Sequence, residues 1–82
     1  MTPDELARRM RETDSLAAKR VARFDLRGRD LRGARLSGSK LVELRCDAAQ
    51  ITGADLASSE WVKCSLKGTL LDASNLAGAT FA

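Results

Sequence analysis

The chain of 82 residues contains no histidine. This absence excludes Ser-His-Asp and Cys-His catalytic centres and metal sites built on imidazole. Only one Trp and two Phe are present, so aromatic rings cannot form a stacking platform for nucleic-acid bases. Two cysteines provide too few thiols for a typical metal site, and no run approaches the ~20 apolar residues of a membrane span. We therefore predict no catalytic, cofactor-binding or metal-ligating residues and no membrane span.

The start of the chain, MTPDELARRM, lacks the apolar segment of a signal peptide. With two cysteines and no export signal, a cytoplasmic location is expected. The net charge is only +3, but it is unevenly distributed. Residues 1–45 carry twelve Lys or Arg against seven Asp or Glu, whereas residues 46–82 carry two against four. The first part is therefore basic and the second mildly acidic.

A period of five residues runs from Phe24 to the last residue without an insertion. The third position of each unit is apolar or a thiol, and we predict that it forms the core ladder. In the first seven units these residues are Leu26, Leu31, Leu36, Leu41, Cys46, Ile51 and Leu56. In the last five they are Trp61, Leu66, Leu71, Leu76 and Phe81.

The first position of each unit is mostly small, and all six glycines occupy the fifth position. A helix would repeat its apolar residues every 3.6 positions and a half-buried strand every two. A chain that turns a corner every five residues satisfies the observed period, because the small and large residues then point inward and glycine permits the corner.

Units such as ADLAS, SNLAG and CSLKG resemble the pentapeptide-repeat family, and the resemblance covers residues 24–82. It implies an all-β solenoid, a right-handed four-sided parallel β-helix of about three coils. Opposite charges that recur every twenty residues agree with four sides, although a spacing of fifteen fits almost as well. The pairs at twenty are Asp25–Arg45, Arg27–Asp47, Asp47–Lys67, Arg35–Asp55, Lys40–Glu60 and Glu43–Lys63.

The segment before the repeats predicts a short capping helix over residues 3–12, with Thr2 as N-cap and Pro3 at the first helical position. We divide the chain into an N-terminal capping helix and lead-in, 1–23, and a repeat domain, 24–82. Leu16 and Val21 are in phase with the ladder, so coiling begins either near residue 14 or near residue 24. Arg29 breaks the pattern by placing a charge inward, either at the rim or against a carboxylate of the helix.

Two surfaces are candidates for contact with a partner. Val42 and Val62 are predicted to form an apolar stripe on one face, and the C-terminal end of the stack is expected to be open. The candidate interface residues are Val42, Trp61, Val62, Leu66, Leu71, Leu76 and Phe81.

The function that these features favour is a non-catalytic scaffold or protein-protein interaction module. Its partner would be another protein, or a second copy in a dimer through the C-terminal end. The family resemblance implies an accessory or assembly role in a larger bacterial system, such as a secretion apparatus or an effector. One alternative is DNA mimicry toward gyrase, but mimicry needs a long acidic rod. The other is weak basic nucleic-acid binding, which lacks a recognition element.

Overall fold

The computed structural model describes all 82 residues and begins with helix α1 (Pro3–Glu12), the helix predicted from the sequence. Thr2 caps it, because its hydroxyl accepts a hydrogen bond from the Glu5 amide at 3.1 Å. Acidic residues occupy the first turn and Arg9 and Arg11 the last, which complements the helix dipole. The N-terminus of the helix is thus set by its cap, proline and charges together.

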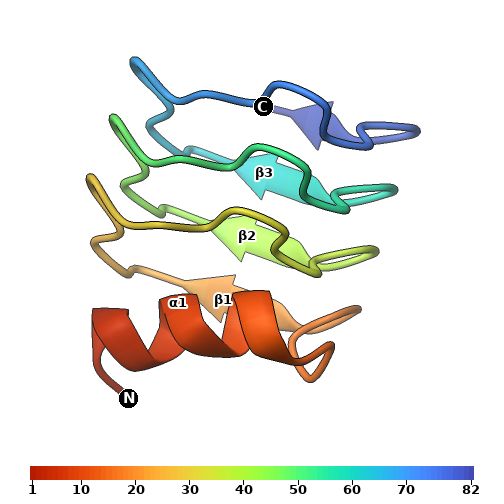
Figure 1. Ribbon diagram of the computed structural model, residues 1–82. Helices are drawn as coiled ribbons and strands as arrows, with labels where there is room; N and C mark the ends of the chain where they lie inside the picture. Colours follow the sequence, from red (N-terminus) through yellow and green to blue (C-terminus); the bar gives the residue numbers. More distant parts are fainter.

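Four short strands then stack in one parallel sheet: β1 (Arg20–Ala22), β2 (Lys40–Val42), β3 (Glu60–Val62) and β4 (Thr80–Phe81). Every pair is in register at a spacing of twenty residues, for example Val21 with Leu41. Figure 1 shows the resulting layers, each lying over the one twenty residues earlier, with α1 and β1 together at the N-terminal end of the stack. Since β1 precedes Phe24, the lead-in segment also takes part in the stack.

Three further ladders run around the stack as isolated parallel bridges with the same spacing of twenty. Together with the sheet they make four ladders, so one layer consists of four five-residue units. The register therefore selects twenty over the alternative of fifteen. The bridged pairs are Asp25–Arg45, Asp30–Gln50, Arg35–Asp55, Arg45–Ser65, Gln50–Leu70 and Asp55–Asn75.

The geometry of the corners explains why glycine is frequent at the fifth position of each unit. The Leu26 carbonyl accepts a hydrogen bond from the Arg29 amide at 3.1 Å, and Gly28 between them has φ +68°. A positive φ at the third residue is the mark of a type II turn. Every fifth residue from 18 to 78 has a positive φ, although seven of these positions are not glycine: Ala18, Arg23, Glu43, Ala48, Ser58, Lys63 and Ala73.

Gly53 offers a test of these corners. Its φ is +66°, and a Cβ placed there would meet no atom within 4 Å, so a substitution reports backbone strain alone. We expect Gly53→Ile to lower the free energy of unfolding by about 1–2 kcal/mol, whereas Gly53→Asn changes it little because Asn tolerates this region. Urea melts followed by circular dichroism measure both, and equal losses would contradict the left-handed corner.

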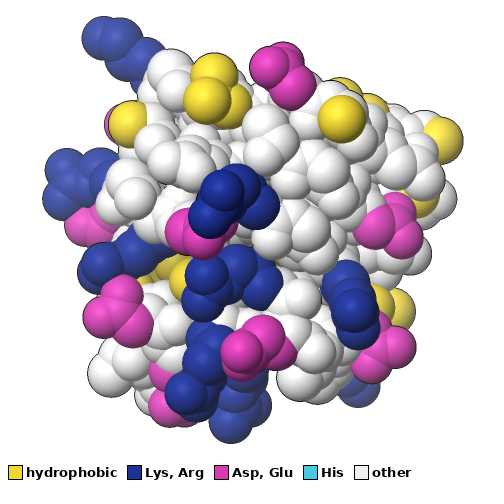
Figure 2. Space-filling model, viewed as in Figure 1, with side chains coloured by type: hydrophobic (Ala, Val, Ile, Leu, Met, Phe, Trp, Pro, Cys, Tyr) yellow, Lys and Arg dark blue, Asp and Glu magenta, His cyan; other side chains and the backbone are white.

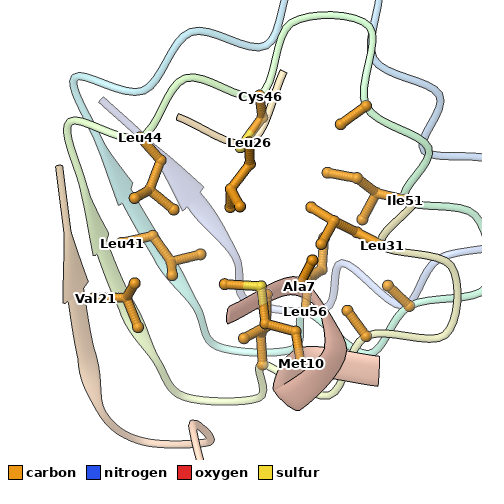
Figure 3. Packing of buried hydrophobic residues seen from close by; sticks show 14 of the residues in the cluster. Ala7, Met10, Val21, Leu26, Leu31, Leu41, Leu44, Cys46, Ile51 and Leu56 are labelled. Carbon is orange, nitrogen blue, oxygen red and sulfur yellow. The ribbon is translucent and has the colours of Figure 1, made fainter. Parts of the chain in front are cut away.

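The core lies inside the four ladders. Leu26, Leu36 and Leu56 are at most 1% exposed, and Figure 3 shows the labelled side chains pointing inward from the surrounding chain. Helix α1 closes one end by burying Leu6 and Met10 against this interior. The two polar residues within the core, Ser39 and Ser59, donate hydrogen bonds to the carbonyls of Leu36 and Leu56, both at 2.6 Å. These bonds satisfy the buried hydroxyl groups where the small inward position is a serine.

Candidate protein-interaction site

The surface of residues 64–82 that faces away from α1, here called the C-terminal edge, is apolar and uncovered. Leu76 is 38% exposed and Phe81 48%, whereas Leu36 and Leu41, at equivalent positions two layers earlier, are buried. Leu66 and Leu71 are partly buried against the core. Four members of the predicted interface therefore lie together on this edge. They occupy the core-ladder position of their units, but their side chains are only partly buried.

The backbone of the C-terminal edge is also unpaired. In the layer below, the amides of Cys46, Ile51 and Leu56 donate to carbonyls nineteen residues later, at 2.8–2.9 Å. The equivalent amides of Leu66, Leu71 and Leu76 have no acceptor, and the carbonyls of Thr69 and Ser74 have no donor. Such a row of unpaired groups is a template for a further strand. The C-terminal edge therefore offers hydrogen bonds as well as apolar area.

Leu70 adds to this apolar area, and sequence reasoning missed it. Its side chain is 53% exposed, and it pairs with Gln50 in a ladder on the side of the stack. It occupies the second position of the unit TLLDA, where several other units carry Asp or Asn. A large apolar residue at that outward position was the signal that could have identified it.

The other predicted surface is the valine stripe on the sheet. Val42 and Val62 are half-buried and directly in register on β2 and β3. Trp61, the residue before Val62 on β3, lies in the core at 2% exposure, so it does not belong to an exposed surface. Its indole Nε1 donates to Ser59 Oγ at 2.9 Å, and its ring stacks on Phe81 with centroids 5.8 Å apart. Trp61 therefore supports the C-terminal edge from beneath.

Of the six oppositely charged pairs at a spacing of twenty within the repeats, only one forms an ion pair. Lys40 Nζ lies 4.0 Å from Glu60 Oε2, while no other pair of the six comes within ion-pair distance. Aspartates instead bind the arginine two residues later: Asp25 Oδ2 lies 2.7 Å from Arg27 Nη2, and each aspartate also accepts the amide of that arginine. The recurrence of charge thus reflects the register of the layers, while the ion pairs themselves form within single corners.

The corner pairs alter the titration of their carboxyl groups. The hydrogen bond from the Arg27 side chain lowers the pKa of Asp25 to about 2, and Arg32 lowers the pKa of Asp30 in the same way. These groups are therefore charged at neutral pH and neutralise two arginines of the basic half. An aspartate at the second position acts structurally here, because it fixes the corner that follows.

Arg29 also has a partner. Its Nη1 lies 2.9 Å from Asp4 Oδ1 of α1, so of the two positions expected for this inward arginine the structure adopts the one at the helix. A second contact joins Arg11 Nη1 to Asp30 Oδ2 at 3.2 Å. These ion pairs fasten the capping helix to residues 24–43.

The two thiols show no sign of activation. Burial raises the pKa of the Cys46 thiol to about 12, and it raises that of Cys64 as well. Cys64 donates to the Leu41 carbonyl at 3.3 Å, as Thr69 and Ser74 do to carbonyls of the layer below. Both cysteines therefore behave as small core residues.

Charge divides the molecule along the stacking axis. Figure 2 shows Lys and Arg side chains crowded over α1 and the layers next to it, while fewer lie near the C-terminal edge. No helix of the protein combines the length and apolar character needed to cross a bilayer.

Comparison with protein families matches the chain to the pentapeptide repeats, in eight copies, over residues 23–57 and 49–82. The chain belongs to this family, whose repeats form a β-helix, and the resemblance seen in the sequence is confirmed. Searches of curated proteins and of solved structures give no significant match.

Proposed function

We propose that the protein is a non-catalytic interaction module that binds another protein, or a second copy, through its C-terminal edge. The observation that carries the proposal is the coincidence on this edge of exposed Leu76 and Phe81 with unpaired backbone amides. Apolar area and strand edges left open in one place are the two ordinary features of a strand-addition surface. We place the module in the cytoplasm, within a larger bacterial assembly such as a secretion or effector system.

The proposed architecture is a right-handed β-helix of about three coils. Parallel crossover connections are right-handed in nearly all proteins. The register of twenty allows residues 24–82 just under three full layers. Because α1 covers the opposite end, two copies that associate end to end meet through like C-terminal edges about a two-fold axis, which gives a closed dimer.

The alternatives have less support. A DNA mimic requires a strongly acidic surface, but the net charge is +3. Nucleic-acid binding would use the basic half, yet Asp25 and Asp30 already neutralise Arg27 and Arg32 there. Titration with duplex DNA at two salt concentrations distinguishes this alternative, because phosphate contacts weaken steeply with salt.

Light scattering on the purified 82-residue protein tests the proposal. We expect a dimer that dissociates on dilution, and we expect Leu76→Asp to make it monomeric by placing a charge on the C-terminal edge. Val62→Asp, on the valine stripe, is the matched control and leaves the dimer intact. A dimer lost only with Val62→Asp would assign the interface to the stripe, and a monomer at all concentrations would rule out self-association.

A further inference from the structure

The outer side of the four-stranded sheet, here called the sheet face, is a second surface that the molecule leaves uncovered. No Cα atom of α1 lies within 8 Å of a strand Cα, so the helix that closes the N-terminal end does not extend over it. Three columns of outward-facing residues run along the stack on this face. They are Arg20, Lys40 and Glu60; Ala22, Val42 and Val62; and, at the adjoining corner, Arg23, Glu43 and Lys63. The valine stripe thus lies between two columns of charge.

The corner column has an unusual backbone conformation. Arg23, Glu43 and Lys63 have φ values of +62°, +54° and +55°, a region that is costly for a residue with a Cβ. All six glycines occupy the other three corners, where the remaining residues are Ala or Ser. Glycine would relieve the strain at this corner too, yet the chain has a long charged side chain there in every layer. Strain of this kind is concentrated at functional sites, which indicates a role for these charges.

Most of the charge on the sheet face is not consumed within the protein. Two loose ion pairs form along the columns, Lys40–Glu60 at 4.0 Å and Arg23–Glu43 at 3.9 Å. Their side chains remain 49–78% exposed. Arg20 and Lys63 form no ion pair. Because exposed pairs of this kind contribute little to stability, these charged groups are available to a partner.

The order of the signs makes the sheet face complementary to a second copy of itself. The centre of the sheet lies between β2 and β3, since the strands follow the order β1-β2-β3-β4. A two-fold axis along the strands through this centre sets β2 of one copy against β3 of the other. Lys40 then faces Glu60 of the second copy, and Glu43 faces Lys63. Each of these opposite pairs occurs twice, as an isologous interface requires.

The apolar column follows the same symmetry. Val42 of one copy faces Val62 of the other, so the two valine stripes meet between the charged columns. Arg20 lies opposite Thr80, which carries no charge, because β1 faces β4. The arrangement therefore places no like charges directly opposite each other.

The other two-fold arrangement of the sheet faces fits less well. An axis parallel to the stacking direction sets each layer against the same layer of the second copy and exchanges the two charged columns. Arg20 then faces Arg23, and these like charges oppose the contact. The signs therefore favour the axis along the strands, which leaves the two stacks antiparallel.

The contact expected from this face is weak. Four strands about 4.8 Å apart, each roughly 10 Å long, give an area of about 200 Å² before the charged flanks are added. A stable complex buries about 800 Å² per partner. A contact of this size acts where copies are already held close together, because a high effective concentration compensates for low affinity.

We propose that the sheet face is a lateral contact between two copies whose stacks run antiparallel. It joins molecules side by side, whereas the C-terminal edge joins them end to end, so the inference does not depend on the proposed function. In an assembly that contains end-to-end dimers, the sheet face links neighbouring dimers.

The variant Leu76→Asp provides the background for the first test, because it removes association through the C-terminal edge and leaves the sheet face unchanged. Sedimentation equilibrium and NMR diffusion should show a monomer at micromolar concentration and a dimer with a Kd of about 0.1–1 mM. Val62→Asp in the same background should abolish this dimer. A folded protein that stays monomeric at several millimolar would overturn the proposal.

Single charge reversals test the arrangement. In a homodimer, Lys40→Glu sets carboxylates opposite carboxylates, and Glu60→Lys sets ammonium groups opposite ammonium groups. We expect each variant to dimerise about ten-fold more weakly than the parent, and we expect an equimolar mixture of the two to regain the parent's Kd. An axis parallel to the stacking direction would leave like charges facing each other in the mixture. A mixture that dimerises as weakly as the single variants would therefore refute the pairing.

Lys40 and Glu60 are exposed, so these reversals should leave the fold intact, which circular dichroism verifies. If Leu76→Asp itself does not fold, the same reversals are made in wild-type protein, where they should weaken only association beyond the end-to-end dimer. Unchanged association at several millimolar would again overturn the proposal. Failure of the C-terminal edge is recognised separately, because the wild-type and Leu76→Asp proteins would then associate identically and both respond to Lys40→Glu.

Discussion

Leu56→Asp should unfold the protein or bring it close to unfolding. Leu56 has no exposed surface and lies in the middle of the stack, between layers that cover it on both sides. An unpaired carboxylate buried there costs at least about 3–5 kcal/mol, judged from the removal of one partner of a buried ion pair. The free energy of unfolding of a native domain is only about 5–15 kcal/mol. Thermal melts followed by circular dichroism measure the loss.

Ala57→Asp is the matched control, one residue along the same unit. Ala57 follows the core position and takes part in the outer corner, where its amide donates to the Asp55 side chain. We expect a loss of about 1 kcal/mol or less, since a partly exposed surface substitution has a small effect. Similar losses in the two variants would contradict the inward orientation of the third position.

Trp61→Ala should cause the second-largest loss. Trp61 is the largest core side chain and is only 2% exposed, so its truncation leaves a cavity that the short strands β2 and β3 cannot close. Truncation of a buried aromatic residue costs about 3–5 kcal/mol. The variant also loses the stacking on Phe81. Urea denaturation at a protein concentration where scattering shows a monomer gives the free energy of unfolding.

Phe81→Ala serves as the comparison, because Phe81 occupies the same column but is 48% exposed. About half of its apolar area is in contact with water, so we expect a loss of about 1–2 kcal/mol in the monomer. If Phe81→Ala proved as destabilising as Trp61→Ala, the C-terminal edge would have to be covered within the monomer.

The sequence predicted the repeat because its signal is redundant. Leu26, Leu31 and their successors mark the interior at every fifth residue, and a single register accounts for all of them. The capping helix was predictable for a local reason, since Thr2, Pro3 and Glu5 specify its start without reference to the rest of the chain.

Contacts that depend on the length and conformation of side chains were harder to predict from the sequence. Asp47 lies twenty residues from both Arg27 and Lys67, but it accepts hydrogen bonds from the Ser65 hydroxyl and the Lys67 amide rather than from either charged group. Periodicity places these residues in columns without specifying which neighbour is nearer. The exposure of Leu70 differs from these contacts, since the period that places Leu71 inward also places Leu70 at the outward second position of its unit.

Because the core repeats every five residues and the surface columns every twenty, insertions into the chain affect the core and the surface differently. Insertion of one five-residue unit would keep every later core residue inside, yet it would turn the whole downstream surface by one side of the stack. Val62 would then leave the column of Val42, and Leu70 would move to another face, while the hydrophobic interior remained continuous. Insertion of four units would lengthen the stack and preserve every column. Gain or loss of single units can therefore rearrange binding faces with little disturbance of stability.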